Sequence, residues 1–238
     1  MRLCPEADAP DFAAFVRERA LAAGVRGWVR GDTAPGEPVA MHAEGPPAAL
    51  AALLHSLAPA LVEAGREPVR VEGHEQFAIR GVPHGRFVVS EHQARARHYD
   101  LRLEVAGTMR SWAVPKGPSL DPAVKRFAVQ VADHAISRPD VEGVSGGGGR
   151  IVWDRGTYEQ GGRVPWPEAL QRGHAVFVLH GSKLTGGWAL QRTRPADPPQ
   201  WLLVKRRDEA ARPGSDITAE RPESVLSGQT LAELLGDG

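Results

Sequence analysis

The sequence predicts an α+β protein, with a small unit of helices and strands followed by a mainly antiparallel β-barrel. Helix-length apolar patterns are confined to the first 80 residues. From residue 86, short alternating stretches are separated by glycine and proline, as in barrels and sandwiches. The composition, 42% hydrophobic and 24% charged over 238 residues, is that of an ordinary soluble globular protein.

The first unit is read from its helix caps and turns. Asp11 caps a helix that runs through residues 14–23, and Gly24 ends it. The elements that follow are strands at 25–30 and 38–45, a helix over 46–65 that starts at proline, and a strand at 67–73. This order is close to the βαββαβ order of ferredoxin-like α/β sandwiches, without an obvious first strand. We therefore predict a ferredoxin-like domain at residues 1–80.

The second unit is read from eight strand-like stretches, at 86–92, 98–105, 111–115, 126–131, 150–156, 175–181, 186–193 and 201–207. The run SGGGG at 145–149 lies between two of them, so we expect a loop there rather than a domain boundary. The barrel domain is predicted at residues 86–212, and residues 213–238 read as a polar tail with a short amphipathic end.

The stretch HYDLRLE contains the candidate functional residues of the barrel. In a strand, His98, Asp100 and Arg102 share one face, and the residues between them form an apolar face. Another histidine, His92, lies six residues earlier. An ordinary half-buried strand with its polar face in water explains the alternation but not these particular residues. In a small barrel we expect this face to line the lumen, where a cation near the histidines and Asp100, and an anion on Arg102, would satisfy the buried groups.

Cysteine and charge set further limits. Cys4 is the only cysteine, which excludes a disulfide framework or a thiolate metal cage and leaves nitrogen and oxygen as metal ligands. The N-terminus does not read as a signal peptide, and no apolar run approaches the roughly 20 residues of a membrane span. We expect a cytoplasmic protein without a membrane partner. Net charge is zero, but residues 1–80 hold 8 basic and 11 acidic residues, which leaves the rest mildly positive and compatible with a polyanion.

Residues 2–75, with FVRERALAAGVRGWVRG and AEGPPAALAALLHSL, resemble acylphosphatase. The resemblance fails at the chemistry, because Ala13 stands at the position of the family's catalytic arginine and Gly31 at that of its catalytic asparagine. Without a guanidinium and an amide, the site has no means of binding an acyl phosphate and orienting water. We therefore expect a non-catalytic scaffold or docking domain.

Residues 86–231 resemble the 3′-phosphoesterase domain of bacterial DNA ligase D. The matching blocks are HQARARHYDLRLE, SWAVPKGPSLDPAVKRFAVQVADH, IVWDRGTYE, LHGSKLTGGWAL, WLLVKRRDE and RPESVLSGQTL. The resemblance implies a nuclease-type hydrolase of DNA repair and non-homologous end joining that removes 3′-phosphates and terminal 3′ ribonucleotides with manganese. It implies DNA or RNA-tailed DNA 3′ ends as substrates, a ligase, polymerase or end-binding protein acting in trans, and association with the nucleoid.

Site residues carry over position by position. The resemblance implies metal ligation by His92, His98 and Asp100, a donor set that suits a first-row divalent ion without choosing manganese over zinc. It implies catalytic roles for His134 and Arg102, and phosphate binding by Arg102, Arg126, His134 and Arg138. An arginine fork suits a phosphate better than a lysine does.

Three departures keep a second hypothesis open. Arg138 replaces the family's tyrosine, the loop before residue 150 is shortened, and the family's N-terminal Arg-Asp-Phe segment is not found. The alternative is a non-catalytic nucleic-acid end-binding or adaptor module that retains the metal site. Other conspicuous side chains are read as structural or unassigned: Trp112, Trp153, Trp188 and Trp201 as packing residues, Lys116 as a solvated turn residue, and His42, His55, His74, His84, His174 and His180 without a role.

Overall fold

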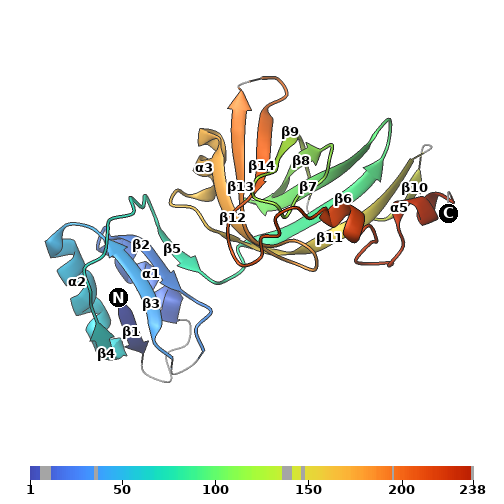
Figure 1. Cartoon of the computed structure of the whole chain (residues 1–238). Coiled ribbons are helices and arrows are strands. Elements are labelled where there is room, and N and C mark those ends of the chain that lie inside the picture. Colours follow the sequence, from blue (N-terminus) through green and yellow to red (C-terminus); the bar gives the residue numbers. More distant parts are fainter. Residues whose placement is uncertain (6–11, 35–36, 136–140, 146–147, 195, 237–238) are drawn as a thin grey trace. The chain divides into compact units, whose positions relative to one another are not determined.

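The computed structural model describes residues 1–5, 12–34, 37–135, 141–145, 148–194 and 196–236. It divides into two compact units (Figure 1). Unit 1 comprises Met1–Val82 with Arg163–Pro165, and unit 2 comprises Pro83–Gly162 with Trp166–Gly238. The α+β class predicted from the sequence is confirmed. The predicted helix cap Asp11 and the predicted phosphate ligand Arg138 lie outside the described residues.

Unit 1 is a sheet with two helices. Its elements are β1 (Arg2–Pro5), α1 (Phe12–Ala22), β2 (Arg26–Arg30), β3 (Val39–Glu44), α2 (Pro47–Leu57), the 3-10 turn η1 (Ala58–Ala60), β4 (Leu61–Gly65) and β5 (Phe77–Arg80). The strand order is β4-β1-β3-β2-β5, in which only the added β5 pairs in parallel, with β2. From β1 to β4 the elements follow the βαββαβ order.

Three details of unit 1 differ from the sequence prediction. The first strand exists as β1, which is only four residues long and buries Leu3 completely. The second helix ends at Leu57, because Pro59 lies in the turn that follows and cannot continue an α-helix. The last strand of the motif is 61–65 rather than 67–73, a segment that contains Pro68 and forms no strand in the structure.

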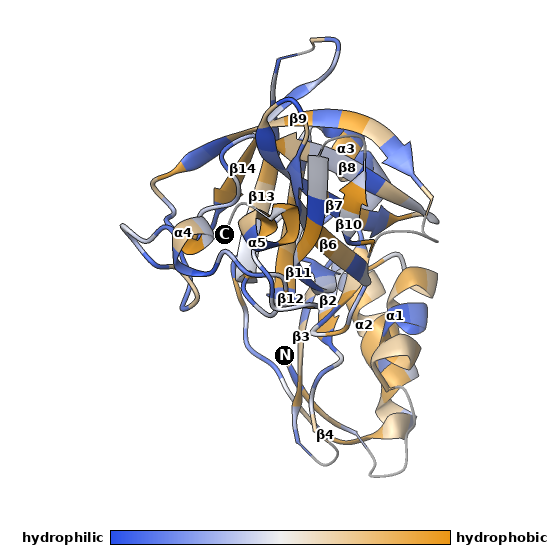
Figure 2. Ribbon diagram, turned by 90° about the vertical axis from the view of Figure 1, so that its right-hand side faces the viewer, coloured by the Kyte–Doolittle hydropathy of each residue, from blue (hydrophilic) through white to orange (hydrophobic). Residues whose placement is uncertain are grey.

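The two faces of this sheet carry different side chains. On β3, Val39 and Met41 join one apolar cluster with residues of both helices, such as Val16 and Leu53. Because strand side chains alternate, His42 and Glu44 of β3 project from the opposite face. In Figure 2, α2 has mostly hydrophobic colouring, whereas α1 carries both hydrophobic and hydrophilic colours. The core of unit 1 thus lies on one side of the sheet.

Unit 2 is a closed antiparallel barrel. Its strands are β6 (Gly85–Gln93), β7 (Arg97–Val105), β8 (Thr108–Val114), β9 (Lys125–His134), β11 (Gly148–Gln160), β12 (His174–Gly181), β13 (Thr185–Arg194) and β14 (Gln200–Lys205). Pairing runs β11-β12-β13-β14-β9-β8-β7-β6, and β6 pairs back to β11. Each of the eight predicted strands is found. The sequence did not predict β10 (Gly143–Ser145), which pairs with the start of β11.

The apolar face of β7 points into the barrel. Leu101 lines a small interior space together with Leu179 and Leu203, which come from β12 and β14. The face with His98, Asp100 and Arg102 is therefore on the outside, so the expectation that it lines the lumen is wrong. This interior space is lined mostly by apolar side chains such as Val89, Val114 and Trp188, which offer an ion no ligands. The four predicted packing tryptophans, Trp112, Trp153, Trp188 and Trp201, are each at most 1% exposed, as predicted.

The C-terminal tail packs on the barrel rather than forming a separate unit. Trp153 Nε1 donates a hydrogen bond to the carbonyl of Arg221, and Lys183 Nζ donates to the carbonyls of Arg221 and Glu223. Val225 packs on an apolar cluster of Val88, Met109 and Val152, which lies on the outer face of the barrel wall. The tail also contains α4 (Ile217–Glu220) and α5 (Leu231–Leu235), and between β11 and β12 lies α3 (Trp166–Arg172). Among the described helices, none has the length and apolar character needed to span a bilayer.

Candidate metal and phosphate site

The predicted metal ligands meet on the β6–β7 hairpin. His92 and His98 are directly opposite each other across the two strands, and their rings are 5.0 Å apart in an edge-to-face arrangement. Asp100 is two residues further along β7, on the same face. One donor atom from each of the three lies within 4.8 Å of the others. Antiparallel pairing therefore brings together residues that the sequence separates by a turn.

Hydrogen bonding orients the His98 ring for ligation. Its Nδ1 is 3.0 Å from the carbonyl oxygen of Ala96, an acceptor, so Nδ1 carries a proton. In the neutral ring Nε2 is then left with its lone pair, and it lies 3.4 Å from Oδ1 of Asp100. A backbone carbonyl bound to the far nitrogen is the usual support of a ligating histidine. Two imidazoles and a carboxylate in this arrangement fit a first-row divalent ion.

The surroundings of His92 favour its neutral form. Burial lowers the pKa of the imidazole, and the positive charges of Arg150 and Arg102 act in the same direction. A metal ligand must be unprotonated, so the shift favours the form that ligates. The nearby carboxylate of Asp100 acts against this shift.

Two arginines converge on the second oxygen of Asp100. An Nη2 atom of Arg102 is 3.3 Å from Oδ2 of Asp100, and Nη2 of Arg150 is 3.7 Å from the same oxygen. Arg102 is only 2% exposed, and its buried Nε has no hydrogen-bond partner among the described residues. A buried guanidinium with spare donors is suited to an anion such as a phosphate. Asp100 thus has metal-ligand neighbours on one oxygen and cations on the other.

Arg150 is a site residue that the sequence did not reveal. It lies on β11, directly opposite His92 in the closure of the barrel between β11 and β6. The alternation in RIVWDRG predicts that Arg150 lies in a strand. Nothing in the sequence tells that this strand closes the barrel on β6 and so brings Arg150 to the site. The arginine is half-buried, so its charge is only partly screened by water.

His134 reaches the same face through Ser111. Ser111 of β8 is directly opposite Arg102, and its hydroxyl is 3.0 Å from Nδ1 of His134. The hydroxyl donates its own hydrogen to the carbonyl of Met109, so it accepts a hydrogen from His134 Nδ1. Nε2 of His134, an exposed residue, is left free to face a ligand. Ser111 is a second residue that the sequence did not single out.

The structure does not bring Arg126 into this cluster. Arg126 is directly opposite Leu203, whose side chain lines the barrel interior, so it leaves β9 on the inward face. The pKa of Asp216 in the tail is lowered chiefly by a hydrogen bond with the side chain of Thr218, and the nearby positive charge of Arg126 acts in the same direction. Within the described residues, Arg126 makes no hydrogen bond or ion pair to the metal-ligand set, and its Nε lacks a partner. Lys116, read as a solvated turn residue, is exposed.

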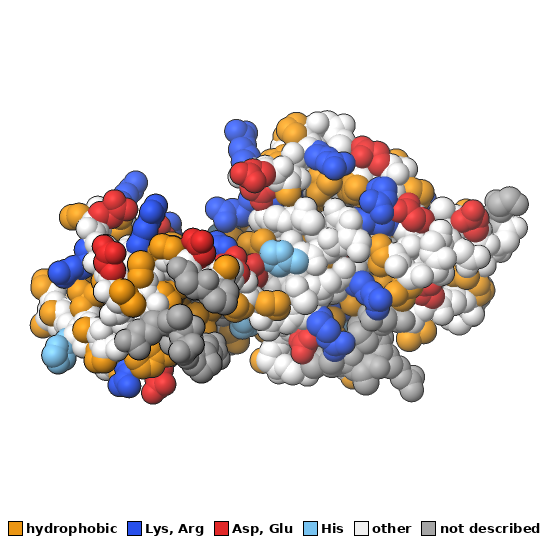
Figure 3. Space-filling model, turned by 90° about the horizontal axis from the view of Figure 1, so that it is seen from below, with side chains coloured by type: hydrophobic (Ala, Val, Ile, Leu, Met, Phe, Trp, Pro, Cys, Tyr) orange, Lys and Arg blue, Asp and Glu red, His pale blue; other side chains and the backbone are white. Residues whose placement is uncertain are grey.

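Basic side chains do not gather into one large patch on the face that Figure 3 shows. On the face shown in Figure 3, lysine and arginine side chains are interspersed with acidic ones. The guanidinium groups of Arg102 and Arg150, which converge on Asp100, are a local feature suited to an anion such as a phosphate.

Comparison with known proteins finds a family model that matches most of the barrel. Residues 90–192 match the model of the DNA ligase D 3′-phosphoesterase domain. That range contains the three predicted metal ligands together with Arg102, Ser111, His134 and Arg150. The resemblance of residues 2–75 to acylphosphatase has no counterpart in these comparisons and stays a prediction.

The similar curated proteins are much longer than this chain. The multifunctional non-homologous end joining protein LigD of Pseudomonas aeruginosa is 48% identical over 161 residues, which are 64% of this chain and 19% of that protein. The corresponding proteins of Mycolicibacterium smegmatis and Mycobacterium tuberculosis are 39% and 35% identical, over 54% and 52% of this chain and 18% and 16% of theirs. The chain thus spans less than a fifth of the length of the curated relatives it matches. Residues 90–192 are thus similar to the DNA ligase D 3′-phosphoesterase domain, and the similarity concerns that part of the chain.

Proposed function

We propose that unit 2 is a divalent-metal-dependent phosphoesterase that heals nucleic-acid 3′ ends in DNA end joining. The observation that carries the proposal is the convergence on Asp100. His98 approaches one carboxylate oxygen, and Arg102 and Arg150 approach the other. A metal centre is thus directly beside a pair of phosphate-binding cations, as phosphoryl transfer requires.

The metal ligands are His92, His98 and Asp100, and the ion that we expect in the cell is manganese. A divalent ion there supplies positive charge beside the phosphate oxygens and lowers the pKa of an attacking water or hydroxyl group. The donor set by itself suits several first-row ions, so the choice of manganese rests on the family alone. Without a metal the two imidazoles already lie close together, and Asp100 holds both arginines near them.

Arg102 and Arg150 bind and orient the phosphate. When a 3′-phosphate is hydrolysed, the oxygen of water bonds to phosphorus, the water gives up one proton to solvent, and the bond from phosphorus to the 3′ oxygen breaks. The leaving 3′ oxygen takes up a proton, for which Nε2 of protonated His134 is the donor. At a 3′ ribonucleotide tail, the 2′-hydroxyl of the penultimate nucleotide is the corresponding nucleophile. Its oxygen bonds to phosphorus and gives up its proton, and the bond from phosphorus to the 5′ oxygen of the terminal nucleoside breaks. That 5′ oxygen takes up a proton and the terminal nucleoside leaves. Arg126 does not contact the phosphate directly in this proposal. Arg138 remains a proposed phosphate ligand.

The substrates that we propose are DNA ends with a 3′-phosphate and DNA tailed with 3′ ribonucleotides. A 3′-hydroxyl is the product that a ligase or polymerase acting in trans can use. The printed names of the relatives, end joining proteins, support this place in repair. In a cell that uses it, we expect the protein to act in the cytoplasm at the nucleoid.

The test is a labelled primer-template that ends in a 3′-phosphate, incubated with the full chain and manganese. We expect conversion to a 3′-hydroxyl by the native chain and none by the His98→Ala variant. His180→Ala is the matched control, because His180 lies on β12 and pairs with Glu159, outside the site. Equal turnover by native and His98→Ala chains would remove the site from the reaction.

A different result would favour the end-binding module. In that case the folded, metal-loaded chain binds a 3′-phosphate end more tightly than a 3′-hydroxyl end, in a salt-dependent way, and forms no product. The matched measurement is binding of the two labelled ends at low and high salt, with and without manganese. Failure of both turnover and end preference would overturn both functions.

A further inference from the structure

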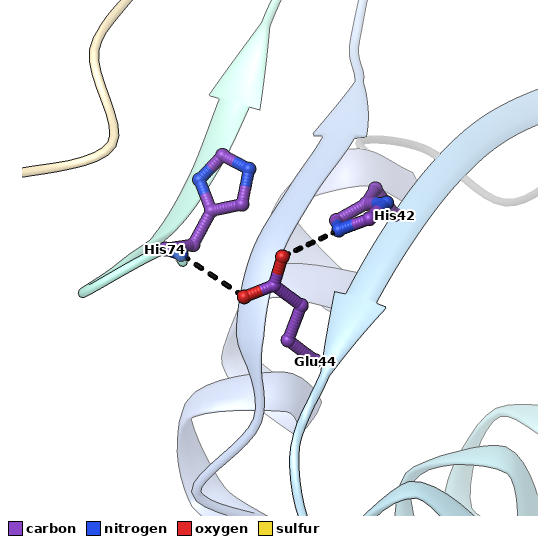
Figure 4. A group of neighbouring side chains, drawn as sticks. All are labelled: His42, Glu44 and His74. Atoms are coloured by element: carbon purple, nitrogen blue, oxygen red, sulfur yellow. Dashed lines mark hydrogen bonds and ion pairs between the residues drawn. The ribbon is translucent and has the colours of Figure 1, made fainter. Parts of the chain in front are cut away.

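Three metal-ligand side chains also meet in unit 1, far along the chain from HYDLRLE. His42 and Glu44 are two residues apart on β3, and His74 comes from the segment between β4 and β5 (Figure 4). One donor atom from each lies within 4.8 Å of the other two. They are on the face of the sheet opposite the apolar core. Neither the family model nor the matched motif reaches these residues.

All three side chains are withdrawn from water. His42 is 7% exposed, His74 is 2% exposed, and the side chain of Glu44 is 10% exposed. Buried imidazole and carboxylate groups need compensation by hydrogen bonds or by an ion. Glu44 accepts backbone hydrogen bonds from Glu72, Gly73 and His74, which fixes the segment 72–74 against β3. These hydrogen bonds explain the burial of Glu44 as a latch between β3 and the segment 72–74. They do not explain why two histidine rings are buried beside it.

The hydrogen bonds of His74 leave a nitrogen ready for an ion. Its Nε2 is 2.9 Å from a carboxylate oxygen of Glu72, so Nε2 carries a proton. In the neutral ring Nδ1 then holds the lone pair, and within the described residues Nδ1 makes no hydrogen bond. A carboxylate behind a ligating imidazole is the common outer support of metal-bound histidine.

His42 is held in the matching orientation. Its ring stacks on Trp28, at 6.2 Å between centroids and 13° between planes, and lies 5.4 Å from the His74 ring. Its Nε2 is 2.7 Å from Oε1 of Glu44. Two ligand atoms on a tetrahedral zinc ion are about 3.4 Å apart, given zinc–nitrogen and zinc–oxygen distances near 2.1 Å. The pair therefore needs to open by less than about 1 Å for an ion to replace the shared proton.

A cleft lies beside two of the three side chains, His42 and Glu44. A cavity of about 530 Å³ is lined by His42 and Glu44 together with residues such as Arg66 and Leu50. It leaves room for water as a further ligand, which a three-residue site requires. The donor set, two imidazoles and one carboxylate, is the set found in zinc sites that keep an open position.

We propose that His42, Glu44 and His74 form a second metal site, which binds a zinc-class divalent ion and is independent of the barrel site. The ion joins β3 to the segment that leads into β5 and leaves one position open to the cleft. The proposal does not rest on the phosphoesterase function, because no residue of HYDLRLE takes part in it.

The test uses the full chain with the barrel site disabled by His92→Ala and His98→Ala. Zinc binding is measured by equilibrium dialysis with elemental analysis of the protein. We expect about one zinc ion per background chain, and a loss to nearly none when His74→Gln or His42→Gln is added. His55→Gln is the matched control, because His55 is an exposed histidine of α2 in the same unit. We expect it to keep the zinc of the background chain.

Two further measurements keep the result clear if a variant folds poorly. X-ray absorption at the zinc edge of the background chain itself should show two imidazole ligands and oxygen. Zinc should raise the thermal midpoint of the background chain and leave that of a folded His74→Gln chain unchanged. A background chain that binds no zinc would reduce the cluster to a hydrogen-bonded latch. Equal zinc binding by background and His74→Gln chains would also overturn the proposal.

Discussion

Arg150 on β11 places a guanidinium Nη2 atom 3.7 Å from Oδ2 of Asp100 on β7. The two residues are not on neighbouring strands, since β6 lies between β11 and β7. They meet because the barrel closes between β11 and β6, with Arg150 directly opposite His92. The closure of the barrel therefore adds a cation to a metal-ligand group that the β6–β7 hairpin builds alone.

Removing the Arg150 charge should weaken phosphate recognition. We expect Arg150→Met to lower kcat/KM on a 3′-phosphate end about 10–100-fold, the value of a hydrogen bond to a charged group. Arg150→Lys should recover part of the loss, because it restores charge without the fork of donors. Steady-state kinetics on both variants measures this. Full activity in Arg150→Met would show that Arg150 only neutralises Asp100.

Asp100 should be needed for metal affinity. Loss of a hydrogen bond that supports a metal ligand weakens metal binding about 10–100-fold. Asp100 is itself a proposed ligand, so we expect Asp100→Asn to weaken manganese binding by more than that. Titration calorimetry of the metal-stripped chain measures the affinity. Asp133→Asn is the control, since Asp133 pairs with Arg110 on the barrel surface, away from the ligands. A chelator should abolish turnover in the native chain, and added manganese should restore it. Unchanged affinity in Asp100→Asn would contradict the assignment.

Ser111 should act on the reaction through His134. We expect Ser111→Ala to lower kcat about tenfold, because the loss of one hydrogen bond of about 1.4 kcal/mol frees the imidazole to turn. The double variant with His134→Ala should lose no more than His134→Ala alone, since the two act as one unit. Thr108→Ala on the same strand bonds elsewhere and serves as the control. Additive losses would mean that Ser111 and His134 act separately.

Lys183 should make stability depend on pH in the alkaline range. Burial lowers its pKa to about 8 from the ordinary 10.5, although its Nζ bonds to two carbonyls of the tail. Between these values the unfolded chain holds the proton more firmly than the folded chain does. The contribution of Lys183 to the free energy of unfolding therefore rises with pH from about 8 to 10.5.

Denaturant unfolding of native and Lys183→Met chains at about pH 7.5 and about pH 9.5 measures this rise. We expect the native chain to gain stability relative to Lys183→Met at the higher pH. Lys116→Met is the control, because Lys116 is an exposed turn residue and should give the same difference at both pH values. A pH-independent difference between native and Lys183→Met chains would show that Lys183 titrates as in water.

Much of the barrel was predictable from local patterns. Its eight strands, the packing tryptophans and the shared face of His98, Asp100 and Arg102 all follow from two-residue alternation and from turn residues. The first unit was less predictable where elements are short. β1 has only four residues, too few for a clear alternation. The strand that pairs with β1 is β4, not the predicted strand at 67–73, and that choice depends on tertiary pairing.

The sequence by itself determined the strands, their alternation and the residue types of the metal group, because these depend on neighbours along the chain. Tertiary structure decided which face of β7 is outside, since filling the interior with Leu101, Leu179 and Leu203 depends on strands that are far apart in the sequence. It also decided that Arg150 joins Asp100, and that His74 meets His42 and Glu44. Those contacts arise from barrel closure and from the path of a loop, and neither leaves a local periodic pattern.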